Sequence, residues 1–312
     1  MTTETPLVSI VCTTYNHENY IRQALDGFLM QQCSFPIEVI VHDDASTDHT
    51  ADIIKEYADK HPFIKTILQT ENQYSKGVDI WEYLFTKEAK GKYITICEGD
   101  DYWTEPYKLQ KQVDFLEKNP EYGLCYSKAK QYSQQKMKFL RKNIGRNSVT
   151  FEKLIYEDTI PTLTVCLSKN LAEKYYKEIC PGQKNWLMGD YPMWLWFSIK
   201  SKIFFMNEIF AVYRILGNSA SHSLNIEKRI HFHFSSLEVR KYFISLFNYT
   251  GIDLNNSEVY FNLFKAAYNN DRREYRKYLK LITTKTIKDV IRYCVGNNSL
   301  LFFLYHLYCK KQ

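Results

Sequence analysis

The first hundred residues of this 312-residue chain alternate apolar runs with amphipathic stretches, and this alternation constrains the fold more than any other feature. Apolar runs typical of buried strands occupy residues 7–12, 37–41, 64–68 and 93–97. Apolar residues at helical spacing fill the intervals at 20–32, 48–60 and 78–89. Strands that alternate with helices predict βαβ units. We therefore expect an α/β fold with a mostly parallel sheet and helices on both faces.

A polar cluster follows three of the four predicted strands at the point where each strand should end. The clusters are Thr13–Asn16, Asp43–Asp48 and Glu98–Asp101. In sheets of this kind, ligands bind beyond the carboxyl ends of the strands. Because parallel strands end at the same edge, we expect the three clusters to converge on one site.

Glu98, Gly99, Asp100 and Asp101 form the cluster with the densest charge. Three carboxylates within four residues repel one another unless a cation neutralises them. Oxygen ligands without a neighbouring His or Cys favour Mg²⁺ or Mn²⁺. The glycine permits a tight turn and a close approach of the backbone. The alternative interpretation is a solvated acidic turn.

The cluster that begins at Asp43 suits the binding of a nucleoside. A carboxylate at this edge of the sheet accepts hydrogen bonds from a base or from ribose hydroxyls. The alternative is an Asx turn that leads into a helix with Thr47 or Asp48 as its N-cap. Capping accounts for one of the three acids and leaves the other two unexplained.

The clusters lie in three stretches that resemble the N-terminal half of a family 2 glycosyltransferase with the GT-A fold: VSIVCTTYNHENYIRQALDGFL, IEVIVHDDASTDHTADII and GKYITICEGDDYW. The resemblance covers about residues 6–130. It implies a Rossmann-like sheet flanked by helices and transfer of a sugar from a nucleoside diphosphate, with UDP preferred, and with inversion at the anomeric carbon. It also implies Mn²⁺ or Mg²⁺, a glycan or lipid-linked saccharide as acceptor, and a role in bacterial surface-glycan synthesis.

Carried over residue by residue, the resemblance assigns the nucleoside pocket to the first two clusters. Thr13 and Tyr15 line the pocket, Asn16 shapes its loop, and Asp43 binds the base. Ala45 replaces a glycine that is frequent in the family, which is tolerable unless the position requires a positive φ.

The resemblance likewise assigns the metal to the third cluster. Glu98, Gly99 and Asp100 stand for the family's DxD motif, with Asp100 as the direct metal ligand and Asp101 beside it in the donor site. Glu98 departs from the commoner Asp, and its longer side chain still reaches a ribose hydroxyl or a water.

The stretch WLMGDYPMW resembles the family segment that carries the catalytic base. Asp190 is the candidate, because an inverting reaction needs a carboxylate to take the proton of the acceptor hydroxyl. The alternative is an ordinary helix N-cap before Pro192. Trp103 and Trp186 are candidates for stacking on the acceptor sugar.

Two further residues come from VYR and NSASHS, which resemble the end of the family's catalytic domain. Arg214 and His222 are candidates for contact with the diphosphate, and His222 is also a candidate metal ligand. The alternative for His222 is a solvated loop residue.

We expect a catalytic domain over residues 1–225, with a donor half to about 130 and an acceptor half over 131–225. A helical, basic and aromatic region should follow over 226–312. Residues 225–312 hold 15 Lys or Arg against 7 Asp or Glu, whereas residues 1–224 hold 26 against 28. Two interpretations have equal weight: contact with the anionic cytoplasmic face of the inner membrane, or packing on the catalytic domain or a second subunit of a homo-oligomer.

Several classes of protein are disfavoured. The eight cysteines form no CxxC pair, which indicates reduced thiols and a cytoplasmic protein. We find neither a basic segment typical of a signal peptide nor an apolar run of 18 residues. No nucleic-acid recognition motif accompanies the basic region. A nucleotidyltransferase would show a glycine-rich phosphate loop after the first strand, and this chain, which reads CTTYNHENY there, has none. The remaining alternative is a non-catalytic nucleotide- or glycan-binding module that keeps the GT-A fold.

Overall fold

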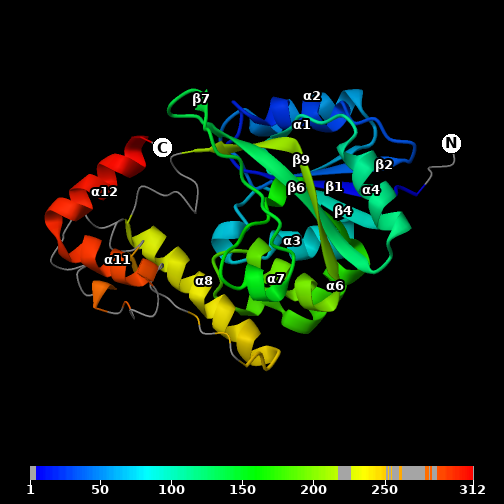
Figure 1. The fold of residues 1–312 in the computed structure, drawn as a ribbon. Coiled ribbons are helices and arrows are strands. Elements are labelled where there is room, and N and C mark those ends of the chain that lie inside the picture. The colour runs from blue at the N-terminus through cyan, green and yellow to red at the C-terminus, as the bar shows by residue number, and fades with distance from the viewer. Residues whose placement is uncertain are drawn as a thin grey trace. The chain divides into compact units, whose positions relative to one another are not determined.

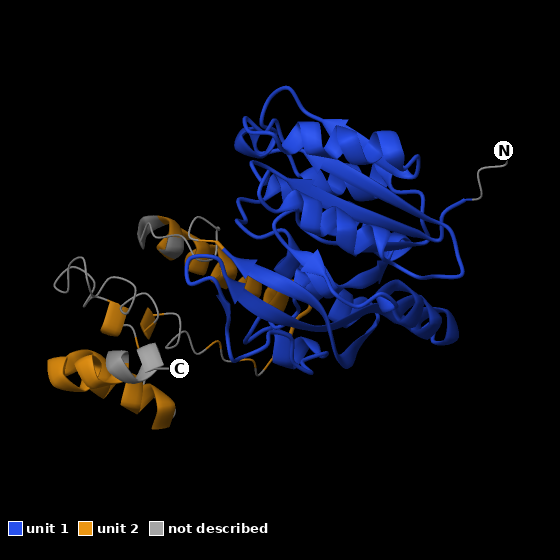
Figure 2. Cartoon of the chain, turned by 90° about the horizontal axis from the view of Figure 1, so that it is seen from above, with its two compact units in different colours: residues 1–215 blue, residues 216–312 orange. Residues whose placement is uncertain are grey.

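The computed structural model describes residues 5–216, 226–250 and 287–311, together with 252, 254, 260–261, 278–280 and 282. The chain forms two compact units, residues 1–215 and 216–312 (Figure 2). The first unit ends at residue 215. Residues 217–225 lie outside the described part of the chain, so a boundary near 225 stays a prediction. The first unit carries the sheet and all three polar clusters.

Four parallel strands form the donor half of the sheet in the order β3-β2-β1-β4. They are β1 (Val8–Thr14), β2 (Ile37–Asp43), β3 (Ile64–Leu68) and β4 (Tyr93–Ile96). Helices α1 (Ile21–Leu29) and α2 (Thr50–Lys60) cover one side of these strands (Figure 1). Alternate residues of β1, such as Ile10 and Cys12, share a core with Leu25 and Phe28 of α1. The predicted alternation of strands and helices is confirmed.

The second half of the sheet is mixed. From β4 the order continues β8-β6-β9-β5, and the β4–β8, β8–β6 and β9–β5 pairs are antiparallel while β6 and β9 run parallel. These strands are β5 (Tyr102–Trp103), β6 (Tyr122–Ser133), β7 (Lys138–Phe139), β8 (Cys166–Ser168) and β9 (Lys202–Ile215). β7 forms a hairpin with β6. The parallel arrangement thus holds for the donor half, and the return strands of the acceptor half make the whole sheet mixed.

Five further α-helices belong to the described part of the first unit. They are α3 (Ile80–Tyr83), α4 (Lys108–Lys118), α5 (Phe151–Leu154), α6 (Lys169–Ile179) and α7 (Asp190–Lys200). The helix predicted over 78–89 is α3 followed by a π-helical turn at Leu84–Glu88. α3, α6 and α7 lie on the side of the sheet opposite α1 and α2 (Figure 1).

The described part of the second unit is helical. It contains α8 (Ile226–Leu246), α11 (Ile287–Asn297) and α12 (Ser299–Lys311). A small core joins Phe261, Leu279, Ile282 and Phe302. Among the described residues, no helix combines the length and apolarity that crossing a bilayer requires.

Trp103 and Lys108 show how tightly the first unit is packed around the sheet. Trp103 is only 2% exposed, and its indole N–H donates to the carbonyl of Leu163 at 2.8 Å. Our expectation that Trp103 stacks on an acceptor is therefore wrong, because its ring is part of the core. Lys108 is fully buried with its Nζ 4.1 Å from the centre of that ring. Its Nζ also donates to Thr95 Oγ1 and Gln112 Oε1, each at 2.8 Å.

Burial of Lys108 should make the stability of this unit depend on alkaline pH. Loss of solvation lowers the pKa of Lys108 to about 8. Below pH 8 both the folded and the unfolded chain carry the proton. Between about pH 8 and 10 only the unfolded chain keeps it, so the free energy of unfolding rises with pH. From pH 7 to 9 we expect a gain of about 1 kcal/mol, or roughly 2–4 °C in Tm.

The measurement is Tm against pH for the natural protein and for Lys108→Met, which should lack this gain. Lys118→Met removes an exposed lysine of the same helix and serves as the control. Equal pH profiles for the natural protein and Lys108→Met would show that Lys108 does not titrate in this range.

Candidate active site

The three polar clusters meet at the carboxyl edge of the donor half, as predicted. The backbone N–H of Asn16 donates to Ser46 Oγ, and Asn16 Oδ1 accepts from the backbone of Thr47, both at 2.8 Å. The N–H of Gly99 donates to the carbonyl of Thr13 at 3.0 Å. The loop after β1 therefore holds the other two loops in place, and Asn16 does so from a left-handed conformation, with φ of 56°, that asparagine tolerates.

Each acid of the second cluster has a local partner. Asp43 accepts from the backbone and the hydroxyl of Ser46. Asp44 accepts from the backbone of Gln73 and of Tyr74, which fixes the segment after β3. Asp48 accepts from the backbone and the hydroxyl of Thr50, but the N-cap of α2 is His49, so neither Thr47 nor Asp48 is the cap that we considered. The acids that capping left unexplained are thus loop anchors.

This arrangement changes two of our expectations. Asp43 is 1% exposed, so in this structure it offers almost no surface to a base. Ala45 has φ of 62°, so the position does require the left-handed backbone that glycine adopts most easily. The alanine is accommodated there at a cost of roughly 1 kcal/mol.

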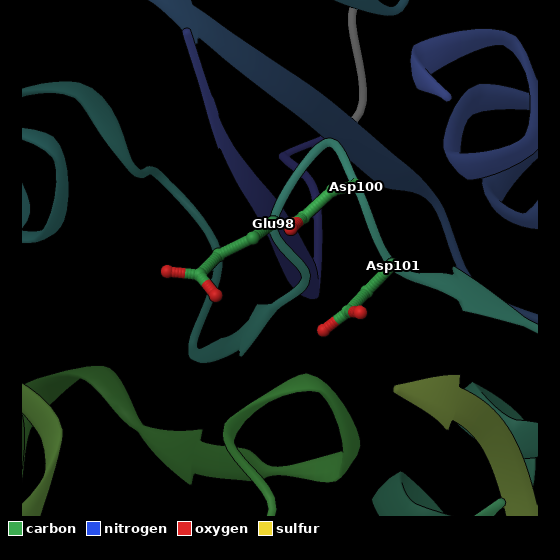
Figure 3. A group of neighbouring side chains, drawn as sticks. All are labelled: Glu98, Asp100 and Asp101. Carbon is green, nitrogen blue, oxygen red and sulfur yellow. The ribbon is translucent and has the colours of Figure 1, made fainter. Parts of the chain in front are cut away.

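The acidic loop, residues 98–101, carries three neighbouring carboxylates (Figure 3). Ligand atoms of Glu98, Asp100 and Asp101 lie within 4.8 Å of one another. Partial loss of water, followed by the charges of Asp100 and Asp190, raises the pKa of Glu98. Burial, followed by the charges of Asp100 and Glu98, raises the pKa of Asp101 well above its usual range. Loss of water is the main cause of both shifts, and the neighbouring carboxylates add to it. Three hard oxygen donors at this spacing fit Mg²⁺ or Mn²⁺.

Gly99 is required for the shape of the acidic loop. A Cβ at this position would lie 2.6 Å from Thr14 Oγ1 and 2.8 Å from its Cβ. Since Thr14 is buried on β1, it has no room to move away. The close approach predicted for this glycine is therefore present.

Arg214 holds the acidic loop from behind. Its backbone N–H donates to Asp101 Oδ1 and its Nε donates to the carbonyl of Asp100, both at 2.6 Å. Its two terminal nitrogens donate to Gln23 Oε1 at 2.7 Å and Gln134 Oε1 at 3.0 Å. The guanidinium also lies near the rings of three tyrosines, Tyr20, Tyr102 and Tyr132.

The environment of Arg214 corrects our expectation that it contacts the diphosphate. The residue is 7% exposed and each guanidinium nitrogen already has a partner within the protein. Arg214 therefore positions the acidic loop. Sequence patterns gave no signal for this role, because its partners lie as far as 191 residues away in the chain.

Asp190 lies near the acidic loop, since its charge contributes to the raised pKa of Glu98. It is the first residue of α7, and the N-cap is Gly189, without a side-chain cap. The ordinary N-cap that we considered is therefore not its role. Its Oδ2 accepts from Thr162 Oγ1 at 2.6 Å, and its Oδ1 accepts from the backbone of Tyr191 at 2.8 Å. The Thr162 contact, which sequence reasoning missed, fixes the direction of the carboxylate.

The other candidates differ in accessibility. Tyr15 is exposed, and Thr13 and Trp186 are half-buried, with Lys184 Nζ 5.5 Å from the Trp186 ring centre. His222 lies outside the described residues. A cavity of about 200 Å³ that we did not foresee lies at the ends of β2 and β3; its lining consists of His42, Gln69, Gln73, Val78, Ile80 and Tyr83.

Comparison with known proteins identifies the family to which the residues of this site belong. Residues 9–176 match the family model described as glycosyl transferase family 2. The chain belongs to this family. Because the match ends at residue 176, it includes the three polar clusters and leaves out Asp190 and Arg214.

Several curated relatives carry names from this class. The chain is 29% identical over 227 residues to the putative teichuronic acid biosynthesis glycosyltransferase TuaG of Bacillus subtilis, which covers 71% of the chain and 84% of that protein. It is 37% identical over 111 residues to the Escherichia coli β-1,3-glucosyltransferase WfaP, and this match covers 36% of the chain and 41% of WfaP. A protein of Mycobacterium tuberculosis without an assigned function is 46% identical over 119 residues, or 38% of the chain. The chain spans about a third of that relative's length, 34%.

Solved structures confirm the predicted GT-A fold. Staphylococcus aureus TarS, residues 1–349, in complex with UDP-GlcNAc, has a TM-score of 0.58 at 16% identity over 93% of the chain and 79% of its own. The mannosyltransferase PcManGT of Pyrobaculum calidifontis, in complex with GDP-Man and Mn²⁺, has a TM-score of 0.53 at 17% identity. The match covers 95% of the chain and 88% of PcManGT.

The role of Arg214 can be tested by measuring how its substitution changes the affinity of the protein for Mn²⁺. Arg214→Lys keeps a positive charge but cannot hold both Asp100 and Gln23. We expect a tenfold to hundredfold loss of Mn²⁺ affinity, as is usual when a residue behind a metal ligand is changed. Titration calorimetry with Mn²⁺ and a nucleoside diphosphate measures this loss.

Gln134→Ala removes one outer partner of Arg214 and should cost much less. If Arg214 contacted the diphosphate, its substitution would instead weaken nucleotide binding in proportion to the number of phosphates, with or without metal. That pattern in Arg214→Lys would contradict the positioning role.

Proposed function

We propose that this protein is an inverting glycosyltransferase that moves a sugar from a nucleoside diphosphate, UDP in the first place, to a hydroxyl of a glycan or lipid-linked saccharide. The observation that carries the proposal is the pairing of two acidic elements. The acidic loop at the end of β4 gathers three oxygen ligands, and Asp190, from a separate helix, lies near it with its carboxylate oriented by Thr162.

The two elements divide the reaction between them. Asp190 takes the proton of the acceptor hydroxyl while that oxygen forms a bond to the anomeric carbon. The bond from this carbon to the diphosphate oxygen breaks, and the nucleoside diphosphate leaves with the electron pair. A single displacement of this kind inverts the anomeric configuration. Asp100 and its neighbours would hold a divalent cation, which when bound would neutralise the charge of the diphosphate.

The nucleoside belongs, in this proposal, at the loop that follows β1. Thr13 and Tyr15 are accessible there. The cavity described above lies beside the same edge, and the half-buried amides of Gln69 and Gln73 in its lining are available to a base. Trp186 remains the candidate for stacking on the acceptor, since its ring is half-buried.

Relatives suggest the setting. TuaG is named for teichuronic acid biosynthesis and WfaP for a diphosphoundecaprenol acceptor, and we propose a related role in bacterial surface-glycan synthesis. The described cysteines, seven in all, are free thiols, which suits the reducing cytoplasm.

Nucleotide binding is the first test. A thermal-shift panel of UDP, GDP, dTDP and CMP, each with and without Mn²⁺, should show one nucleoside diphosphate that stabilises the protein only with metal. At a hundredfold excess over Kd the gain is about 2.7 kcal/mol, or several degrees in Tm. Asp100→Asn should abolish the metal-dependent part, whereas Asp59→Asn, an exposed acid of α2, should keep it. No shift from any nucleotide would favour the non-catalytic module.

Transfer is the second test, with the nucleotide sugar that corresponds to the nucleotide found to bind. Asp190→Asn should leave its binding unchanged and lower the rate of nucleoside diphosphate release by roughly 10²–10⁴. Thr162→Val, which removes the orienting hydroxyl, should have a smaller effect. Full activity of Asp190→Asn would return this residue to a structural role.

A further inference from the structure

Helix α11 exposes an apolar face. Ile287, Val290, Ile291 and Cys294 follow the three- and four-residue spacing of one helix face, and all four are exposed, Ile287 by 82%. The opposite face is buried and includes the charged Asp289, which pairs with Arg292. A helix at the surface of a soluble protein normally has the reverse arrangement. The face therefore has the composition of a surface that meets something apolar.

Helix α12 continues this surface. Leu300, Leu301, Phe303 and Leu304 are exposed, Leu300 by 66%, whereas Phe302 is buried against Phe261. The two helices contact each other, and Asn298 joins them by accepting from the backbone of both Leu300 and Leu301. We call the exposed residues of α11 and α12 the apolar hairpin face.

Positive charge accompanies the apolar hairpin face. Residues 287–312 contain Lys288, Arg292, Lys310 and Lys311 against the single acid Asp289. That acid is buried and paired with Arg292, whereas Lys288 is exposed. The whole segment 225–312 has 15 Lys or Arg against 7 Asp or Glu. Exposed apolar side chains combined with excess positive charge are the features of a helix that lies in the interface of an anionic membrane.

We propose that the apolar hairpin face binds the surface of an anionic lipid bilayer. Charge distinguishes the two partners that could cover this face, a second copy of the chain and an anionic lipid. A second copy of the chain would bring the same excess of positive charge to the contact, which opposes association, whereas phosphatidylglycerol or a similar lipid supplies the opposite charge. The helices, of 11 and 13 residues, are too short to span the bilayer and suit its interface. The proposal is independent of the reaction.

Sedimentation of the full-length protein with vesicles tests this proposal. We expect binding to vesicles that contain phosphatidylglycerol, weaker binding at high salt, and little binding to phosphatidylcholine alone. The double substitution Ile291→Ser with Leu304→Ser should lower the partition coefficient at least tenfold. Met137→Ser with Phe139→Ser removes two exposed apolar residues of the β6–β7 hairpin and should leave it unchanged.

Other outcomes would overturn the proposal. Failure of the natural protein to bind anionic vesicles, or equal binding by the double variant, contradicts it directly. A dimer in light scattering that the double substitution dissociates would assign the face to a second copy. A lower Tm of the double variant in the absence of vesicles would assign the face to packing within the chain. Nucleotide-induced thermal shifts, which should be the same in both double variants, report separately on the donor site.

Discussion

The repulsion among Glu98, Asp100 and Asp101 is the constraint on which the site depends. Three carboxylates within 4.8 Å would push the loop open unless donors held it. Arg214 supplies two of these donors, one to the side chain of Asp101 and one to the carbonyl of Asp100. Gly99 supplies a third, to the carbonyl of Thr13. These three donors therefore keep the acidic loop in one shape although its acids crowd one another.

The features that sequence could predict depend on neighbours in the chain. Buried strands such as Ile37–Asp43 read as continuous apolar runs because helices cover the sheet, and polar residues must follow where the strand ends. The donor loops therefore followed from pattern alone. Trp103 and Arg214 were misjudged for the opposite reason. Their roles depend on Leu163 and Gln23, which lie 60 and 191 residues away, and no periodicity connects such positions.

The two halves of the first unit differ in how much of each the family model matches. The family model covers residues 9–176, which include the parallel strands and every donor loop. Asp190, Trp186 and Arg214 lie beyond it, on α7, the segment before it and β9. The family match therefore speaks for the three polar clusters and is silent on these later residues. The apolar hairpin face lies further along the chain, in the second unit.

The long separation between Arg214 and the acidic loop has a consequence for the newly made protein. The donor loops leave the ribosome before the strand that stabilises one of them, because Arg214 follows Asp100 by 114 residues. During synthesis the parallel strands can already be paired while the acidic loop still lacks its clamp. The acidic loop therefore gains the contacts of Arg214 only when β9 docks beside β6, so the last strand of the sheet completes the support of a loop made 114 residues earlier.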